Sequence, residues 1–368
     1  MKTLTSKNRL LAVAIAVMCQ LVFDTAHTFA QSITVPRTAS PSASAMQTIG
    51  ISTVKVDYSR PAVRGREIWG ALVPYGWNVE GFGAQKESPW RAGANENTVV
   101  TFSHPVKVEG TEVPAGSYGL FFTINPDNSG EVILSKDYRS WGSYWYDPLN
   151  DQLRAKIKTR DIPHTEFLTY DFINLTEDGG ELVLNWEKKQ FPVTLEFAVD
   201  EIVMANAEQE LKGEVGFTPQ GYASAANYAL QNNINVEKAL GWIDQALANN
   251  NNFTNKRIKA GLLKLTGKSA DADKLMKEAM AAGTEAEMNI YGYQLLQQGA
   301  HDEAIAIFTI NTERHPKSAN TWDSLGEGYV AKGDKQNAIK CFKKSLSLNP
   351  PANVKANSEK FLKQLGEM

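Results

Sequence analysis

The chain has 368 residues, with 38 Lys and Arg against 41 Asp and Glu and a formal net charge of −3. A dedicated nucleic-acid-binding protein usually carries a basic excess, so this balance argues against a nucleic-acid partner. The length is sufficient for two or three domains. The 2 Cys residues exclude a multi-disulfide scaffold and a four-thiolate metal site.

The first residues have the form of a secretory signal peptide. Basic side chains precede an apolar run at residues 10–23, and small residues then occupy positions Thr28 and Ala30. This order is typical of a cleaved export signal. We therefore expect residues 1–30 to be removed after Ala30 and the mature protein to be exported, either periplasmic or secreted.

Two other interpretations of this segment remain open. An uncleaved anchor would use the same apolar run, although the run is short for a bilayer. A lipoprotein would be modified at Cys19, but such a site needs a small residue before the cysteine and Met18 stands there. Since the other apolar runs are shorter still, no transmembrane span is expected in the mature chain.

The next part of the chain has the pattern of a linker and a β domain. Residues 31–47 are rich in Ser, Ala, Thr, Gln and Pro and are predicted to form a flexible linker. Over residues 48–200, apolar and polar side chains alternate in short runs separated by Gly, Pro and Asn. A period of two is typical of half-buried antiparallel strands. We therefore expect an antiparallel β-sandwich or barrel domain and, without βαβ alternation, no nucleotide-binding parallel sheet.

Beyond residue 200 the apolar residues recur every three or four positions, which is typical of helices. We expect a connecting segment at residues 201–217. The strongest motif of the chain follows at Trp322, Leu325, Gly326, Tyr329, Ala338, Phe342 and Pro350. This spacing resembles the tetratricopeptide repeat, a helix-turn-helix unit of about 34 residues.

The same motif recurs earlier in the chain. Matching positions lie one repeat upstream, at Gly292, Ala304, Phe308 and Pro316. They predict two clear repeats at residues 285–318 and 319–352, two degenerate repeats at 218–250 and 251–284, and a capping helix at 353–366. We therefore expect residues 218–368 to form an α-helical tetratricopeptide solenoid, in which the small Gly326 lets two helices approach and Phe342 fills the gap between them.

The resemblance implies a protein or peptide partner, because tetratricopeptide arrays usually bind such partners on their concave face. In this chain the face would include Asn289, Tyr293, Asn320, Asp323 and Glu327. Asp323 and Glu327 would repel a carboxylate, which argues against capture of a chaperone's C-terminus. Alternatively, the repeats brace the β domain or mediate dimerisation.

Four segments of the β region are rich in Arg, Trp, Tyr, Gly and Pro, at residues 59–76, 88–98, 114–121 and 141–147. In this order they resemble the bacterial domain-of-unknown-function family numbered 2911, over about residues 47–200. The resemblance implies an exported, β-rich domain without an established activity. Residues 77–87 look like an insertion relative to shorter members, so the rim of a pocket there is expected to differ.

The arginine and aromatic side chains of these segments are the candidate ligand site. Arginine forks bind carboxylate or phosphate groups and aromatic rings stack on sugars or cations, so a pocket would suit an anionic or glycan-like ligand. The candidate residues are Arg60, Arg64, Trp90, Arg91, Asn95, Glu96, Trp141 and Tyr144. The competing interpretation is structural, with the arginines paired to Glu67, Glu96 or Asp147 and the aromatic rings in the core.

Catalytic signals are weak, and no catalytic residue can be assigned. No His pair has a zinc-ligand spacing and no Gly-x-Ser-x-Gly elbow occurs, so neither a metal nor a cofactor is expected. The sequence favours a non-enzymatic, exported binding or scaffold protein, with the β domain for a small or envelope ligand and the repeats for a protein. The alternatives are a hydrolase of envelope carbohydrate or peptide that uses Glu96 or Asp147 as acid/base, and a purely structural assembly protein.

Overall fold

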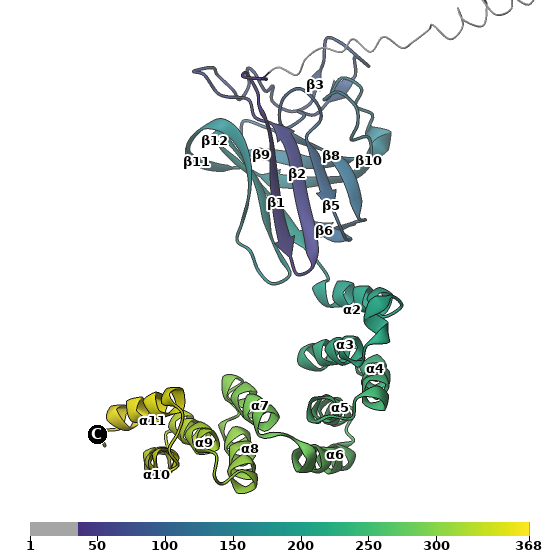
Figure 1. Ribbon diagram of the computed structural model, residues 1–368. Coiled ribbons are helices and arrows are strands. Elements are labelled where there is room, and N and C mark those ends of the chain that lie inside the picture. The colour runs from purple at the N-terminus through teal and green to yellow at the C-terminus, as the bar shows by residue number, and fades with distance from the viewer. Residues whose placement is uncertain (1–35, 368) are drawn as a thin grey trace, which may run out of the picture. The chain divides into compact units, whose positions relative to one another are not determined.

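The structure is a computed structural model that describes residues 36–367. These residues divide into two compact units, with the boundary in sequence between Phe197 and Ala198 (Figure 1). The predicted signal peptide at residues 1–30 lies outside the described residues. None of the helices described is both long and apolar enough to cross a membrane.

The first unit is built from antiparallel sheets. The larger sheet has 6 strands in the order β1 (Ser42–Ile49), β2 (Ser52–Ser59), β5 (Val99–Phe102), β8 (Gly116–Ile124), β9 (Ser129–Ser135) and β10 (Asp151–Lys158). The second has 4 strands in the order β11 (Arg160–Ile173), β12 (Gly179–Glu196), β6 (Val106–Val108) and β7 (Thr111–Val113). A short hairpin pairs β3 (Asn78–Val79) with β4 (Glu87–Ser88), and η1 (Pro148–Asn150) precedes β10. This confirms the predicted antiparallel β domain.

The core of this unit lies between the two main sheets. The ring of Phe122 on β8 lies 5.2 Å from that of Phe191 on β12, and the ring of Tyr58 on β2 lies 4.8 Å from that of Tyr170 on β11. The two sheets also contact where the edge strands β1 and β11 meet and where β10 meets β12 and β7. The arrangement is therefore a sandwich of two packed sheets.

The predicted linker at residues 31–47 is wrong at its C-terminal end. β1 pairs with β2 along its whole length, from Ser42 opposite Ser59 to Ile49 opposite Ser52. Only the last side chain of β1 is buried. An edge strand needs little apolar surface, so its small polar residues resembled those of a flexible linker.

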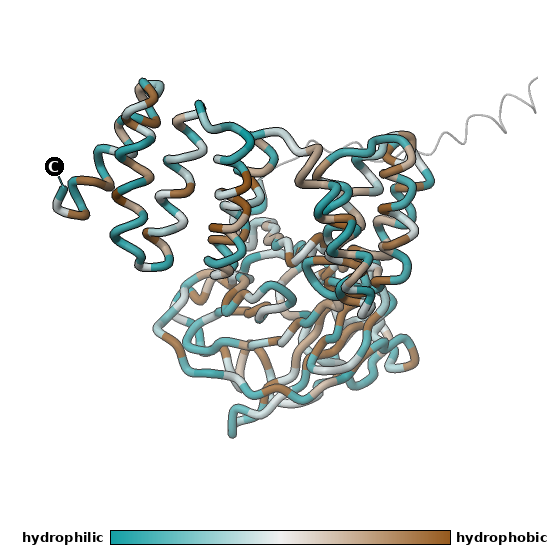
Figure 2. Tube along the Cα trace, turned by 90° about the horizontal axis from the view of Figure 1, so that it is seen from below, coloured by the Kyte–Doolittle hydropathy of each residue, from teal (hydrophilic) through white to brown (hydrophobic). Residues whose placement is uncertain are grey.

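The second unit consists of helices joined by short loops. It begins with α2 (Val199–Glu210) and η2 (Glu214–Phe217), which lie at the predicted connecting segment. Four helical pairs follow, α3 (Pro219–Asn232) with α4 (Val236–Asn249), α5 (Phe253–Leu265) with α6 (Ser269–Ala282), α7 (Glu285–Gln297) with α8 (His301–Arg314), and α9 (Ala319–Lys332) with α10 (Lys335–Ser347). α11 (Ala352–Gln364) ends the array. Each pair falls within one predicted repeat, and Figure 2 shows hydrophobic and hydrophilic residues interspersed along the helices.

Close packing of the paired helices depends on small residues. A Cβ atom at Gly326 on α9 would lie 2.7 Å from the ring of Phe342 on α10, closer than van der Waals contact. Phe342 in turn stacks on Phe361 of α11, with ring centres 5.1 Å apart. These contacts confirm the predicted roles of Gly326 and Phe342.

We predict that Gly326→Ala lowers the free energy of unfolding of the helical unit and that Gly241→Ala raises it. At position 326 the new Cβ meets a ring that cannot retreat, and overpacking costs up to about 3 kcal/mol, which outweighs the gain of about 1 kcal/mol in helix propensity. At position 241 of α4, no atom lies within 4 Å of the Cβ site, so only the propensity gain acts. Urea unfolding followed by circular dichroism measures both; equal stabilisation by the two variants would contradict the close contact.

Candidate functional site

A cavity of about 600 Å³ lies in the β unit beside the segment that joins β2 to β5. Most of its lining comes from residues 61–95 of that segment, with Trp186 of β12 and the residues just before β1 completing it. The charged side chains of the lining are those of Arg64, Arg66, Glu80 and Arg91. The lining therefore has an excess of positive charge.

Two tryptophans form the aromatic part of the lining. Trp90 and Trp186 stack with ring centres 5.8 Å apart and 15° between their planes, and Trp69 packs edge-on against both. Trp90 is also held by two backbone hydrogen bonds of 2.9 Å to Phe122 on β8. Trp186 is 1% exposed, and its indole N–H has no hydrogen-bond partner among the described residues. A buried donor without a partner costs about 1–3 kcal/mol, which a ligand acceptor that reached it would recover.

The guanidinium of Arg91 is held by three neighbours. Its Nη1 donates to the backbone oxygen of Asn95 at 2.7 Å, and its Cζ lies 4.8 Å from the ring centre of Tyr144. A Cβ atom at Gly142 would lie 2.2 Å from Arg91 Cζ, and Gly142 has a φ of +63°. Glycine adopts this φ without strain, and a side chain at position 142 would overlap the Arg91 guanidinium.

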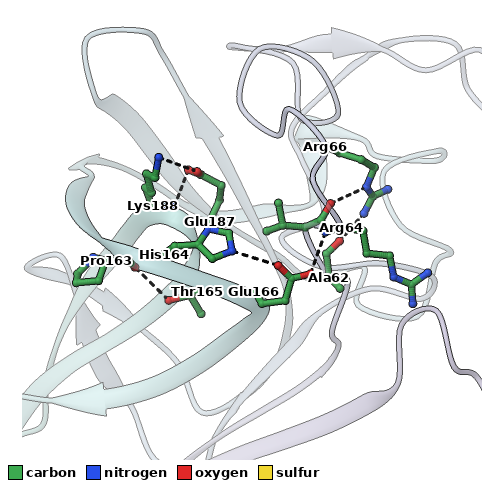
Figure 3. A network of polar contacts seen from close by, with 10 residues as sticks. Ala62, Arg64, Arg66, Pro163, His164, Thr165, Glu166, Glu187 and Lys188 are labelled. Atoms are coloured by element: carbon green, nitrogen blue, oxygen red, sulfur yellow. Dashed lines mark hydrogen bonds and ion pairs between the residues drawn. The ribbon is translucent and has the colours of Figure 1, made fainter.

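Arg64 and Arg66 lie on the loop after β2 (Figure 3). Arg66 Nη2 donates to the backbone oxygen of Ala62 at 2.5 Å. The backbone N–H of Arg64 donates to Glu166 Oε1 on β11 at 2.9 Å, and Glu166 Oε2 lies 3.1 Å from His164 Nε2 (Figure 3). Both contacts lower the pKa of Glu166, the Arg64 N–H most of all. β11 thus fixes the loop that carries two of the cavity arginines.

The cavity arginines are not neutralised by the carboxylates that the structural interpretation assigned to them. Their side-chain hydrogen bonds go to backbone oxygens. Glu96 pairs with Arg37 instead, and Asp147 accepts from the backbone N–H of Leu149 at 3.0 Å. Among the described residues, no ion pair joins these arginines to Glu67, Glu96 or Asp147, so that predicted pairing is wrong and the positive charge of the lining stays available.

Positive φ angles occur at four non-glycine positions of the segment between β2 and β5. Arg64, Gln85, Ala92 and Asn95 adopt φ values of 49°, 55°, 53° and 61°. Specific contacts hold this conformation, since Ala92 O accepts from the Tyr170 hydroxyl at 2.9 Å and Asn95 Nδ2 donates to Ser40 O at 3.4 Å. Strain that its surroundings enforce is characteristic of binding sites, which supports a functional role for the loop.

In the helical unit, the predicted partner face is occupied by a hydrogen-bond network. The Tyr293 hydroxyl donates to Glu327 Oε1 at 2.9 Å and lies 3.2 Å from Ser324 Oγ. Asn357 on α11 donates to both Glu327 and Asp323 at 2.8 Å. Burial raises the pKa of the two carboxyl groups, and the hydrogen bonds oppose that rise. The network joins α7, α9 and α11.

Comparison with known proteins identifies the two units. Residues 40–195 match the profile of a family described as a protein of unknown function, DUF2911. Residues 319–352 match the tetratricopeptide repeat. The chain carries a DUF2911 domain and a C-terminal tetratricopeptide repeat. Both resemblances inferred from the sequence are confirmed.

Similar proteins match parts of the chain. Superkiller complex protein 3 of Mus musculus and of Homo sapiens is 39% identical over 59 residues, which is 16% of this chain and 4% of theirs. The chain therefore spans a small fraction of these curated relatives. Among solved structures, YrrB, described as a TPR protein with an unusual peptide-binding site, is 19% identical, with a TM-score of 0.26 over 44% of this chain and 84% of its own. PilF of Pseudomonas aeruginosa is 20% identical, with a TM-score of 0.26 over 42% of this chain and 72% of its own.

In the DUF2911 domain, half of the predicted ligand residues meet at one cavity. Arg64, Trp90, Arg91 and Asn95 line it, and Tyr144 contacts Arg91. The remaining three predicted residues do not line it, so the eight candidates do not form a single pocket. Arg60 donates to Leu168 O and Thr169 Oγ1 on β11, Glu96 borders a separate depression, and the Trp141 side chain is 48% exposed.

The predicted site residues did not include Arg66, Glu80 or Trp186, which also line the DUF2911 cavity. Arg66 belongs to the same arginine-rich segment as Arg64, so that segment carried the signal. Trp186 had no local signal, because its position in an alternating strand is that of an ordinary core residue. Only the packing of β12 against the loop of Trp90 brings Trp186 to the lining.

The predicted partner residues of the repeats are mostly engaged within the chain. Asp323 is 4% exposed beneath α11, so its predicted role in contacting a partner is wrong. Glu327 and Tyr293 bind each other, and Asn320 Nδ2 donates to Glu285 Oε1 at 3.4 Å. Asn289 has a buried Oδ1 without a partner among the described residues. α11 takes the place that a further repeat would occupy, which covers this end of the array.

Neither predicted acid/base candidate lines the DUF2911 cavity, whose one carboxylate is that of Glu80. Within residues 36–367, no group of three or more His, Cys, Asp and Glu side chains is arranged to hold a metal ion. The chemistry that the cavity offers is therefore hydrogen bonding and charge complementarity.

We predict that Asn357→Ala lowers the free energy of unfolding of the helical unit by about 1–3 kcal/mol at neutral pH. The reason is that two buried carboxylates each lose a hydrogen bond. Asn353→Ala, at an exposed position of the same helix, is the matched control and should be nearly neutral. Chemical unfolding of both variants measures the difference.

The loss caused by Asn357→Ala should shrink as the pH falls. The pKa values of Asp323 and Glu327 are raised in the folded protein. The folded protein therefore binds protons at a higher pH than the unfolded chain does. Acidification stabilises the folded protein in the pH range between the raised pKa values and the ordinary carboxyl pKa. Removal of Asn357 raises both values further. A loss that is identical at about pH 7 and about pH 5 would show that these carboxylates do not carry the effect.

Proposed function

We propose that this protein is a non-enzymatic binding and scaffold protein. The DUF2911 domain binds a small anionic ligand in the arginine cavity, and the tetratricopeptide repeats hold a protein or peptide partner. Repeats of this kind typically mediate protein interactions. The proposal places the protein outside the cytoplasm, periplasmic or secreted, on the signal peptide expected at residues 1–30.

One observation carries the ligand proposal, namely three arginines around one cavity that donate to backbone oxygens and not to carboxylates. Such guanidinium groups keep their full charge and fit carboxylate and phosphate groups in a fork geometry. The volume of about 600 Å³ lies in the range of small-molecule sites, roughly 300–1,000 Å³. The half-buried Trp90 ring offers apolar contact to a sugar or another ring.

The same geometry argues for binding rather than hydrolysis. A glycosidase needs two carboxyl groups across the bond that it cleaves, about 5–9 Å apart. The cavity holds one carboxylate, Glu80, while Glu96 and Asp147 are engaged elsewhere. A purely structural protein, the other alternative, would not need an arginine cavity of this size.

The ligand proposal predicts selective stabilisation by anions. Glucuronate and glucose 6-phosphate should raise the melting temperature of the DUF2911 domain, whereas neutral glucose should not. Arg64→Gln, Arg66→Gln and Arg91→Gln should each weaken binding by about 10- to 100-fold, because each removes a charge-assisted hydrogen bond. Arg139→Gln is the matched control, since Arg139 lies outside the lining and donates to Tyr138.

Differential scanning fluorimetry and calorimetric titration measure these effects. Equal shifts with glucose and with the two anions would contradict a charge-based site. The absence of any shift, together with a melting temperature that falls in the arginine variants, would favour the structural alternative.

A further inference from the structure

A second polar cavity, of about 540 Å³, lies in the helical unit. Its lining comes mainly from α3, α5 and α7, the first helices of three consecutive repeats. The residues that line it include two cations, Arg257 and Lys264, and five amide side chains, Asn227, Gln231, Gln294, Gln297 and Gln298. The lining contains no Asp or Glu.

Arg257 is the half-buried cation of this cavity. Its Nη2 donates to Asn227 Oδ1 on α3 at 3.3 Å, and its Cζ lies 5.3 Å from the ring centre of Tyr291 on α7. Burial lowers the pKa of the guanidinium, opposed by Tyr291, and no carboxylate of the described chain contributes. Arginine has five N–H donors, so most of those of Arg257 have no partner among the described residues.

Several lysines of the same unit have acidic partners within it. Lys259 on α5 pairs with Asp244 at 2.6 Å, and Lys332 on α9 pairs with Asp302 at 2.6 Å. The second cation of the cavity, Lys264, lies 3.9 Å from Asp273, and both side chains are exposed, so this pair is weak. Arg257 therefore differs from these lysines in being half-buried without an acidic partner among the described residues.

The two ends of the array also differ. At α9 and α11 the hydrogen-bond network of Tyr293, Asp323, Glu327 and Asn357 fills the inner side with the chain's own groups. At α3, α5 and α7 a cavity with unpaired positive charge remains. The net charge of −3 of the whole chain argues against a polyanion such as RNA as its occupant.

We propose that α3, α5 and α7 bind an acidic segment of a partner protein, in which a peptide carboxylate pairs with Arg257. This rests on the proposed function of the repeats and names the chemistry of the partner. A carboxylate accepts two parallel hydrogen bonds from one guanidinium. These bonds would compensate for the hydration that Arg257 loses by being half-buried. The surrounding Asn and Gln amides both donate and accept, so they match the N–H and C=O groups of a peptide backbone.

The test is a synthetic array of random peptides, about twelve residues long with both termini blocked, probed with the full chain. Bound peptides should be enriched in Asp and Glu, and a matched neutral peptide with Gln in place of Glu should bind about 10- to 100-fold more weakly. A second array of neutral peptides with free C-termini asks whether a terminal carboxylate serves as well as a side chain. Either carboxylate source supports the proposal.

Two variants test the role of Arg257. Arg257→Gln should abolish the acidic enrichment, while Lys277→Gln, an equal charge change on α6 outside the lining, should preserve it. Asn227→Asp should also abolish it, because the new carboxylate would lie 3.3 Å from Arg257 Nη2 and take the place of the peptide. This variant should melt at a higher temperature than the unmodified protein, so a loss of binding would not reflect unfolding.

Three results would overturn the proposal. Peptides that bind without acidic enrichment would leave the repeats as a protein-binding array but remove the role of Arg257. Acidic enrichment that survives both Arg257→Gln and Asn227→Asp would place the carboxylate elsewhere. A complete lack of peptide binding would remove both this proposal and the partner function of the repeats.

Discussion

The stack of Trp90 on Trp186 joins the two parts of the β domain from which the arginine cavity is made. Trp90 comes from the segment between β2 and β5, and Trp186 from β12 in the other sheet. Trp69 and the backbone bonds to β8 lock the stack in place. Together with the contact of Arg64 with Glu166 on β11, this stack holds the segment that carries the arginines against the sheets.

Charge without a counter-ion is a feature shared by the two candidate binding sites. The cavity arginines of the DUF2911 domain donate to backbone oxygens, and Arg257 of the repeats donates to an amide. Such neutral partners satisfy the geometry of a guanidinium but leave its charge uncompensated. Both sites would therefore gain most from an anionic ligand, although the chain as a whole carries a net charge of −3.

The carboxylates of the repeats follow the opposite arrangement. Asp323 and Glu327 are half-buried or more and are held by the Tyr293 hydroxyl, the Ser358 hydroxyl and the Asn357 amide. Their hydrogen bonds tie α11 to the last repeat and close that end of the array. The open part lies at α3, α5 and α7, so the proposed partner would bind across the two degenerate repeats and the first helix of the repeat at residues 285–318.

Much of the architecture was determined by the sequence alone, because it rests on local periodicity. The change from a period of two to one of three or four marked the two units, and the spacing from Trp322 to Pro350 placed the helical pairs. The sequence did not predict the edge strand β1, because an edge strand needs little apolar surface and β1 has no clear apolar pattern. The sites were decided by tertiary structure. Trp186 reaches the cavity from another sheet, and α11 buries Asp323. Arg257 lies between α3 and α7 in a cavity that no Asp or Glu lines. Each of these contacts depends on which distant parts of the chain come together in the fold.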